Sequence, residues 1–154
     1  MDAFEQQLRA TTQDNGMMGY KGQWFVWIHG AGNSIWMNEN VLQSYEGTIR
    51  LAPVKLNVRA NFTSLRTVGT FLINAEIHPG GKVTYAKITS EAGSNCKLIP
   101  SWNGQVCIRE YPSKTQVQTR STNSQISFAT SKGKTYIVDR PTEPWEDQPL
   151  HLLY

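Results

Sequence analysis

The clearest alternation of apolar and polar positions in this chain lies between residues 71 and 90. Apolar residues recur there at every second position, at Phe71, Ile73, Ala75 and Ile77. Side chains at that spacing share one face of a strand. The His-Pro-Gly-Gly sequence at 78–81 has the composition of a turn, and residues 83–90 are again rich in β-branched and aromatic side chains. The pattern therefore predicts an antiparallel hairpin over 71–90.

Further short strands are expected on both sides of that hairpin. Residues 48–51 alternate until Pro53 interrupts the pattern. A second hairpin is expected over 96–108 with its tip near Trp102, and short strands follow at 116–119, 126–130 and 134–138. Turn residues recur about every eight to twelve positions, and no helical run interrupts this region, which is typical of an antiparallel β-sandwich.

The N-terminal part has a different pattern. Residues 2–12 place Ala3, Phe4 and Leu8 at helical spacing, and residues 17–32 are aromatic and glycine-rich without a clear period. A second helix is expected from Asn33 or Ser34 to about Ser44, ended by Gly47. Its apolar residues are Ile35, Trp36, Met37, Val41 and Leu42. They cover more than half of the circumference, so we expect this helix to be buried on more than one side.

These patterns predict a mainly β fold, an antiparallel β-sandwich preceded by a short helical segment. The expected parts are a helical, Trp-rich segment over 1–47, the sandwich over 48–140 and a Pro-rich extended tail over 141–154. The first part contains Trp24, Trp27 and Trp36 but is too short to bury them alone. Those rings require cover from the sandwich, another chain, a sugar or a further segment of protein.

Several motifs together resemble a known family. The stretch "ENVLQSYEGTIRLAPV" at 39–54 resembles the end of the catalytic domain in glycoside hydrolase family 95, whose α-L-fucosidases and α-L-galactosidases are built on an (α/α)6 barrel. Three later motifs are similar to the small β-sandwich that follows the barrel. They are Leu-Arg-x-x-Gly-x-Phe at 65–71, Ser-Glu-x-Gly at 90–93 and Trp-x-Gly at 102–104. The likeness spans roughly residues 30–140.

The resemblance implies that the chain is the C-terminal part of a carbohydrate-active enzyme and that 1–47 is the end of its barrel. Its partner would be the upstream barrel, in a periplasmic or secreted parent, although residues 1–5 show no signal-peptide pattern. Family members carry a catalytic aspartate just before this helix, and the alignment places Ile28 there. The resemblance therefore implies a diverged branch and a structural, non-catalytic role for this chain.

Two residues remain candidates for catalysis. Glu39 would share a helix face with Glu46, about 10 Å along the axis, whereas inverting glycosidases set two carboxyl groups about 6.5–9.5 Å apart across a cleft. His29 could act as an acid–base group or contact a sugar hydroxyl. Alternatively, Glu39 could bind backbone amides in the barrel, and His29 could be a loop residue bonded to a backbone carbonyl.

Sugar binding is the other candidate activity. Trp24, Trp27 and Trp36, with Tyr20, could form a platform for sugar rings, and Asn33 is a further candidate for contact with the sugar. The alternative for the tryptophans is packing within the barrel. The chain would then be a carbohydrate-binding module. A third alternative is a small protein that self-associates through its Trp-rich segment.

Composition excludes several other classes. The net charge of +3 and the lack of a basic stripe argue against nucleic-acid binding, and no apolar run approaches the roughly 20 residues of a membrane span. No metal-ligand or cofactor motif is present in the sequence. Cys96 and Cys107 would lie on opposite faces of the expected hairpin, so they form a disulfide only if a bulge intervenes and are otherwise free thiols.

Overall fold

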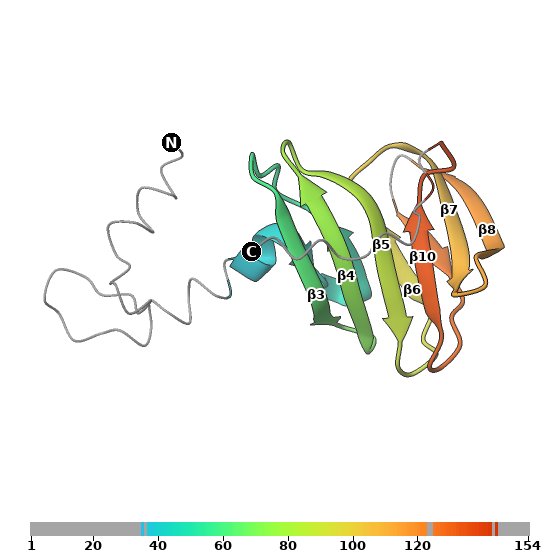
Figure 1. The fold of residues 1–154 in the computed structure, drawn as a ribbon. Coiled ribbons are helices and arrows are strands. Elements are labelled where there is room, and N and C mark those ends of the chain that lie inside the picture. The colour runs from blue at the N-terminus through green and yellow to red at the C-terminus, as the bar shows by residue number, and fades with distance from the viewer. Residues whose placement is uncertain (1–34, 36, 123–124, 143, 145–154) are drawn as a thin grey trace, which may run out of the picture. The chain divides into compact units, whose positions relative to one another are not determined.

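The computed structural model describes residue 35, residues 37–122 and 125–142, and residue 144. The chain divides into two compact units, Met1–Glu39 and Asn40–Tyr154. The second unit contains two β-sheets packed face to face, and a short helical segment precedes them (Figure 1). The sequence-based prediction of a mainly β sandwich with a helical segment before it is therefore confirmed.

The helical segment ends earlier than predicted. Residues 35 and 37–41 are helical, but the next two residues form strand β1 (Leu42–Gln43), so the prediction that the helix reaches Ser44 was wrong. The chain turns back through the 3-10 segment η1 (Tyr45–Gly47), where Glu46 and Gly47 have φ of 54° and 71°. This reversal pairs β1 with the following strand, and those ladder hydrogen bonds replace a further helical turn.

Two apolar residues of the helix are also more exposed than predicted. Ile35 is 62% exposed and Met37 is 53% exposed, although the pattern predicted a helix buried on more than one side. Val41 is partly buried against the sandwich core, and Leu42, already in β1, lies inside it. The width of an apolar stripe therefore overestimated the cover that this helix receives in the described part of the chain.

The large sheet has six strands in the order β3-β4-β5-β10-β7-β8, all antiparallel. Its strands are β3 (Ala60–Thr67), β4 (Phe71–His78), β5 (Lys82–Ser90), β7 (Gly104–Tyr111), β8 (Thr115–Thr122) and β10 (Thr135–Asp139). β4 and β5 form the hairpin predicted over 71–90, with Ile73 opposite Ile88. The apolar alternation thus fixes both the pairing and the buried face of this hairpin.

The small sheet has four strands in the order β1-β2-β6-β9, and it lies behind the large sheet in Figure 1. Its remaining strands are β2 (Thr48–Leu51), β6 (Cys96–Ile99) and β9 (Ile126–Phe128). β2 and β6 are parallel, whereas the other pairs are antiparallel. The expected short strands near 48–51, 116–119, 126–130 and 134–138 are all present.

The hairpin predicted over 96–108 was wrong, because β6 and β7 belong to different sheets. Leu98 of β6 and Ile108 of β7 are both fully buried, but they reach the core from opposite layers instead of pairing side by side. The connection carries Trp102, which is only 7% exposed and is part of the core. The Arg140 guanidinium lies 4.7 Å from the centre of its ring.

The two cysteines are free thiols, as one of the two predicted alternatives required. Cys96 lies in the core between the sheets, and burial raises the pKa of its thiol to about 12. Cys107 is buried on β7, and its thiol donates a hydrogen bond to Oε1 of Gln116 at 3.4 Å. Because the thiolate is the reactive form, the Cys96 thiol is chemically inert in the folded protein at neutral pH.

Candidate functional site

Most of the site residues predicted from the sequence lie outside the described residues. They are Trp24, Trp27, His29, Asn33 and Trp36. A sugar platform made of these tryptophans, sugar binding by Asn33, and a catalytic or sugar-binding role for His29 therefore stay predictions.

Glu39 and Glu46 do not share a helix. Glu39 is in the helical segment and half-buried, whereas Glu46 is exposed in η1, beyond the end of the helix and with φ of 54°. The prediction that the two carboxylates lie on one helix face was wrong, because the chain leaves the helix at Val41 and turns. The spacing of about 10 Å expected from seven helical residues does not apply to this pair.

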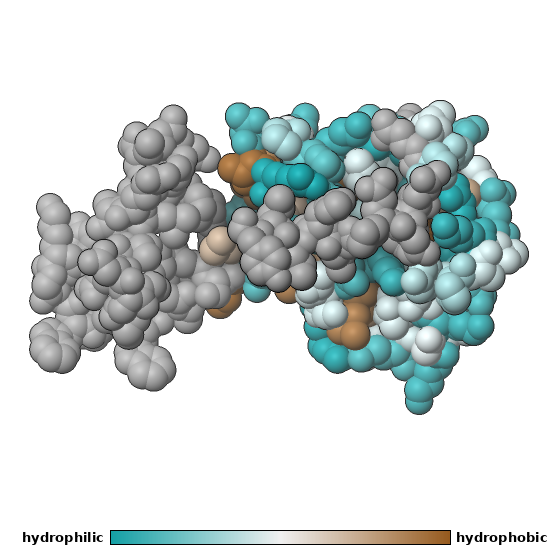
Figure 2. Space-filling model, viewed as in Figure 1, coloured by the Kyte–Doolittle hydropathy of each residue, from teal (hydrophilic) through white to brown (hydrophobic). Residues whose placement is uncertain are grey.

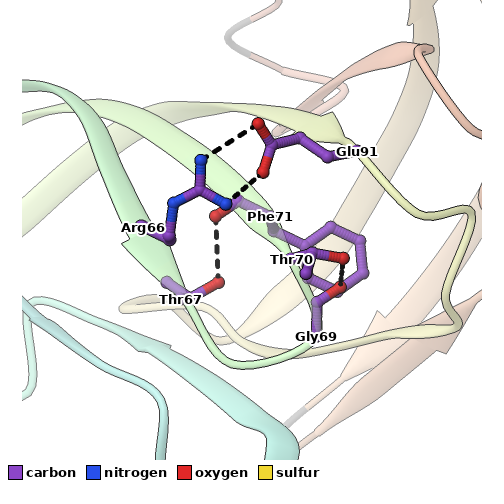
Figure 3. Close-up of polar contacts among 6 residues, drawn as sticks. All are labelled: Arg66, Thr67, Gly69, Thr70, Phe71 and Glu91. Carbon is purple, nitrogen blue, oxygen red and sulfur yellow. Dashed lines mark hydrogen bonds and ion pairs between the residues drawn. The ribbon is translucent and has the colours of Figure 1, made fainter.

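The motifs that carry the family resemblance can be followed in the structure, and the first joins two distant segments. Arg66 on β3 holds Glu91, just after β5, through both carboxylate oxygens (Figure 3). Its Nη2 donates to Oε1 at 3.1 Å, and its Nη1 contacts Oε2. The Glu91 backbone N–H donates to the Thr70 carbonyl oxygen at 3.0 Å. Together these contacts tie the β3–β4 turn to the end of β5.

The same turn requires its glycine. Gly69 has φ of +87°, a conformation that residues with a Cβ rarely adopt, and an added Cβ would lie 2.8 Å from Cε2 of Phe71. The Phe71 ring is part of the buried core. The Thr67 hydroxyl donates to the Phe71 carbonyl oxygen at 3.4 Å. The Leu-Arg-x-x-Gly-x-Phe motif is thus a tight turn folded against a core aromatic ring.

The Ser-Glu-x-Gly motif fastens the end of β5 to the turn between β9 and β10. The Ser90 hydroxyl oxygen accepts hydrogen bonds from the Gly93 N–H at 3.0 Å and from the Thr130 hydroxyl at 2.7 Å. The Gly133 N–H donates to the Ser90 carbonyl oxygen at 2.7 Å. Gly93 has φ of +78°, and an added Cβ would lie 3.0 Å from the Lys132 backbone nitrogen. Both motifs therefore build turns of the sandwich.

The outer face of the large sheet contains a buried ion pair. Asp139 on β10 is fully buried, and its Oδ2 accepts a hydrogen bond from Nη1 of Arg109 on β7 at 3.0 Å. The ammonium group of Lys87 on β5 lies 3.8 Å from the centre of the Tyr111 ring. Where Figure 2 colours this face, it is mostly hydrophilic with small hydrophobic patches. Arg109 and Asp139 are thus paired with each other, whereas Lys87 lies over an aromatic ring.

The other acidic residues of the large sheet are also paired with cations. Glu76 on β4 binds Arg59 and lies 3.7 Å from Nε2 of His78. Glu110 on β7 accepts a hydrogen bond from Nζ of Lys134 at 2.6 Å. This pairing raises the pKa of Lys134 above its usual value. The negative charges of Glu76 and Glu110 are therefore neutralised by Arg59 and Lys134 within the protein.

Net charge is unevenly distributed along the chain. Residues 40–142 contain thirteen Lys and Arg against five Asp and Glu, a net charge of +8, whereas the segments on either side contain two against seven, a net charge of −5. Four of the five acids in 40–142 are the ion-paired residues Glu76, Glu91, Glu110 and Asp139. The sandwich thus carries a large excess of positive charge that the whole-chain value of +3 conceals.

Part of that excess lies on the outer face of the small sheet. Ile49 and Leu98 point into the core, so the alternate positions of their strands point outward. We call these positions the small-sheet face, and they are Gln43, Thr48, Arg50, Lys97, Ile99 and Ser127. Lys97 and Ser127 are exposed, Gln43, Arg50 and Ile99 are partly exposed, and Thr48 is buried. None of these six residues is acidic, and neither Arg50 nor Lys97 forms an ion pair within the described part of the chain. The net charge of +3 for the whole chain does not reveal these two cations, because acidic residues outside 40–142 offset them.

The described residues contain no group of three or more His, Cys, Asp or Glu placed to hold a metal ion. No helix among them is long and apolar enough to span a membrane.

Comparison with known proteins found no matching family model and no matching curated protein. The likeness to glycoside hydrolase family 95 therefore depends on the sequence motifs alone. The structure adds a physical role for each of the motifs around Gly69 and Gly93, both of which adopt positive φ in tight turns.

Proposed function

We propose that this chain is a non-catalytic, structural C-terminal domain of a carbohydrate-active glycoside hydrolase similar to family 95. The observation that carries the proposal is the role of the resemblance motifs. Arg66, Gly69 and Phe71 of one motif and Ser90 and Glu91 of another form turns and inter-strand ties. Because the residues that carry the resemblance stabilise the fold of the sandwich, they support a structural role for this domain.

The acidic residues of the sandwich support a non-catalytic role. Glycoside hydrolysis requires two carboxyl groups flanking the bond to be cleaved, one as an acid and one as a base or nucleophile. Four of the five acids in residues 40–142 are held by Arg or Lys side chains. The fifth, Glu46, is exposed in a turn. None of these contacts places one carboxyl group opposite another.

Exposed apolar residues support a neighbouring domain as the partner. Ile35 and Met37 of the helical segment are more than half exposed. Within the sandwich, the Val68 N–H donates to the Ser44 hydroxyl oxygen at 3.2 Å, and both Val68 and Tyr45 are exposed beside this contact. Exposed apolar side chains that lie close together are typical of surfaces that meet another protein. The upstream helical barrel implied by the resemblance is the partner that we propose.

Turnover measurements test the catalytic part of the proposal. The full 154-residue chain should release no product from aryl α-L-fucosides or aryl α-galactosides. Activity that is lost in Glu39→Gln but retained in Glu76→Gln would contradict the proposal, because both substitutions remove one carboxylate and only the first concerns a candidate catalytic group.

Light scattering tests the apolar surface. Without its partner domain, the chain should self-associate at high concentration, because exposed apolar surface then pairs with itself. Tyr45→Ser with Val68→Ser should reduce this association, whereas Val117→Ser, at another exposed valine, should not. A chain that stays monomeric at every concentration would contradict a docking role for Tyr45 and Val68. It would equally contradict the alternative of a self-associating protein.

A further inference from the structure

The small-sheet face has a regular arrangement of side chains. Gln43, Arg50 and Ile99 lie opposite one another across β1, β2 and β6, and Thr48, Lys97 and Ser127 form the next row across β2, β6 and β9. Neighbouring strands are about 4.8 Å apart, and positions two residues apart along a strand are separated by about 6.7 Å. The Cα atoms of Arg50 and Lys97 are therefore about 8 Å apart on the diagonal. Two cations at this spacing can bind two acidic groups of one extended ligand.

Neighbouring polar side chains are oriented by contacts within the sandwich. The Ser127 hydroxyl oxygen accepts a hydrogen bond from Nδ2 of Asn95 at 2.6 Å, so its own proton remains for another acceptor. The Thr48 hydroxyl donates to Oε1 of Gln125 at 3.3 Å, which leaves the amide N–H groups of Gln125 as donors. Both contacts favour donation toward a ligand. Hydrogen-bond donors and cations together form a surface for oxygen-rich anions.

We propose that the small-sheet face binds an acidic polysaccharide through Arg50 and Lys97, with Ser127 and Gln125 donating to the same ligand. Charge complementarity carries this inference. The face has no acidic residue, neither cation forms an ion pair within the described part of the chain, and the surrounding unit has an excess of positive charge over residues 40–142. The acidic groups of the ligand are carboxylates of uronic acids or sulfate esters.

A saccharide fits this face better than a single-stranded nucleic acid does. Proteins that hold single strands stack the bases on aromatic side chains, and the six residues of the small-sheet face include none. Hydroxyl and amide groups, by contrast, are suitable partners for sugar hydroxyls. The inference rests on the proposed function only in this choice of a saccharide among polyanions.

Direct binding to the full chain is the test. Calorimetric titration should show binding of polygalacturonate or of a sulfated polysaccharide at low salt, and no binding of a neutral glucan of similar length. Raising the salt from about 50 to 200 mM should weaken the binding severalfold, because salt screens exposed charges. The two acidic polymers distinguish carboxylate from sulfate as the group recognised. Failure of both to bind would overturn the inference and leave the proposed structural role untouched.

Paired substitutions locate the site. Arg50→Gln with Lys97→Gln should weaken binding about threefold to tenfold, as expected for two exposed ion pairs. Lys55→Gln with Lys132→Gln removes the same charge from two exposed loop positions and should leave the affinity within about twofold. Equal losses in both variants would overturn the assignment to this face. Binding of single-stranded nucleic acid in preference to either polysaccharide would also overturn it.

Discussion

The outer faces of the two sheets differ in whether their charged side chains are paired. On the large sheet, Asp139 is fully buried and bonded to Arg109, which is only 17% exposed, and Glu76 is matched by Arg59. On the small sheet, Arg50 and Lys97 face outward with no acid beside them on that face. The paired charges of the large sheet contribute to folding stability, whereas the cations Arg50 and Lys97 of the small sheet, unpaired among the described residues, do not.

Desolvation explains the difference. A carboxylate removed from water is stable only when it is paired and hydrogen-bonded, so the large sheet has to supply a cation for Asp139. Lys97 is exposed and keeps its hydration, so it needs no partner within the protein. The outer face of the large sheet therefore contributes to stability, whereas the small-sheet face is available to bind a ligand.

The largest expected effect comes from breaking the buried pair. Arg109→Ala should reduce the free energy of unfolding by about 3–5 kcal/mol, because it leaves the Asp139 carboxylate buried without its cation. Urea denaturation followed by tryptophan fluorescence measures this loss. Removing both groups, as Arg109→Ala with Asp139→Ala, should restore part of the stability. A double variant less stable than Arg109→Ala would contradict this account.

The β3–β4 turn should show the next largest effect. Gly69→Ala should cost about 2–4 kcal/mol, since positive φ is unfavourable for alanine and the added Cβ would force the Phe71 ring to move. Gly80→Ala is the matched control, with φ of +81° and nothing within 4 Å of the added Cβ, and should cost only about 1 kcal/mol. Equal losses of thermal stability would show that the contact with Phe71 is unimportant.

The ion pair at the same turn is exposed and should contribute less. Arg66→Ala should reduce stability by about 0.2–1 kcal/mol, because solvent screens the attraction to Glu91. A double-mutant cycle with Glu91→Ala isolates the pair, and its coupling energy should shrink further in about 1 M salt. A coupling energy above about 2 kcal/mol would mean that this exposed pair stabilises the fold as strongly as a buried pair does, and would contradict the prediction.

The smallest effect on stability is expected at the small-sheet face. Arg50→Gln with Lys97→Gln should change the free energy of unfolding by no more than about 0.5 kcal/mol, because neither cation has an ion-pair partner to lose in the described part of the chain. Thermal denaturation beside the wild-type chain measures it. A loss of stability comparable to that of Arg109→Ala would show that the cations of the small-sheet face also stabilise the fold, and would contradict the comparison.

Local sequence patterns predicted the elements whose partners are close in the chain. The 71–90 hairpin was correct in its strands, turn and buried face, because alternation and the Pro-Gly-Gly turn specify all three locally. The 96–108 hairpin was wrong although its strands were correctly located. Two apolar strands separated by a turn sequence can pair with each other or pack across a core, and the choice depends on strands elsewhere in the chain.

Strand β3 shows a different limit. The alternation did not mark it, because the register shifts between Phe62 and Leu65 and Ser64 has φ of 56°, so the buried positions do not follow a regular period of two. The small-sheet face was missed for a related reason. Arg50 and Lys97 are 47 positions apart in sequence and become neighbours only through the parallel pairing of β2 with β6.

That parallel pairing also orders the events of folding. Thr48 meets Lys97 only after the β3–β5 meander between them has been synthesised and collapsed, since closing so long a loop costs entropy that local contacts must first offset. A nascent chain that ends before Cys96 would leave β2 without β6, its parallel neighbour, so one edge of β2 would stay unpaired. During translation, β2 can therefore pair with β6 only after β6 has emerged from the ribosome.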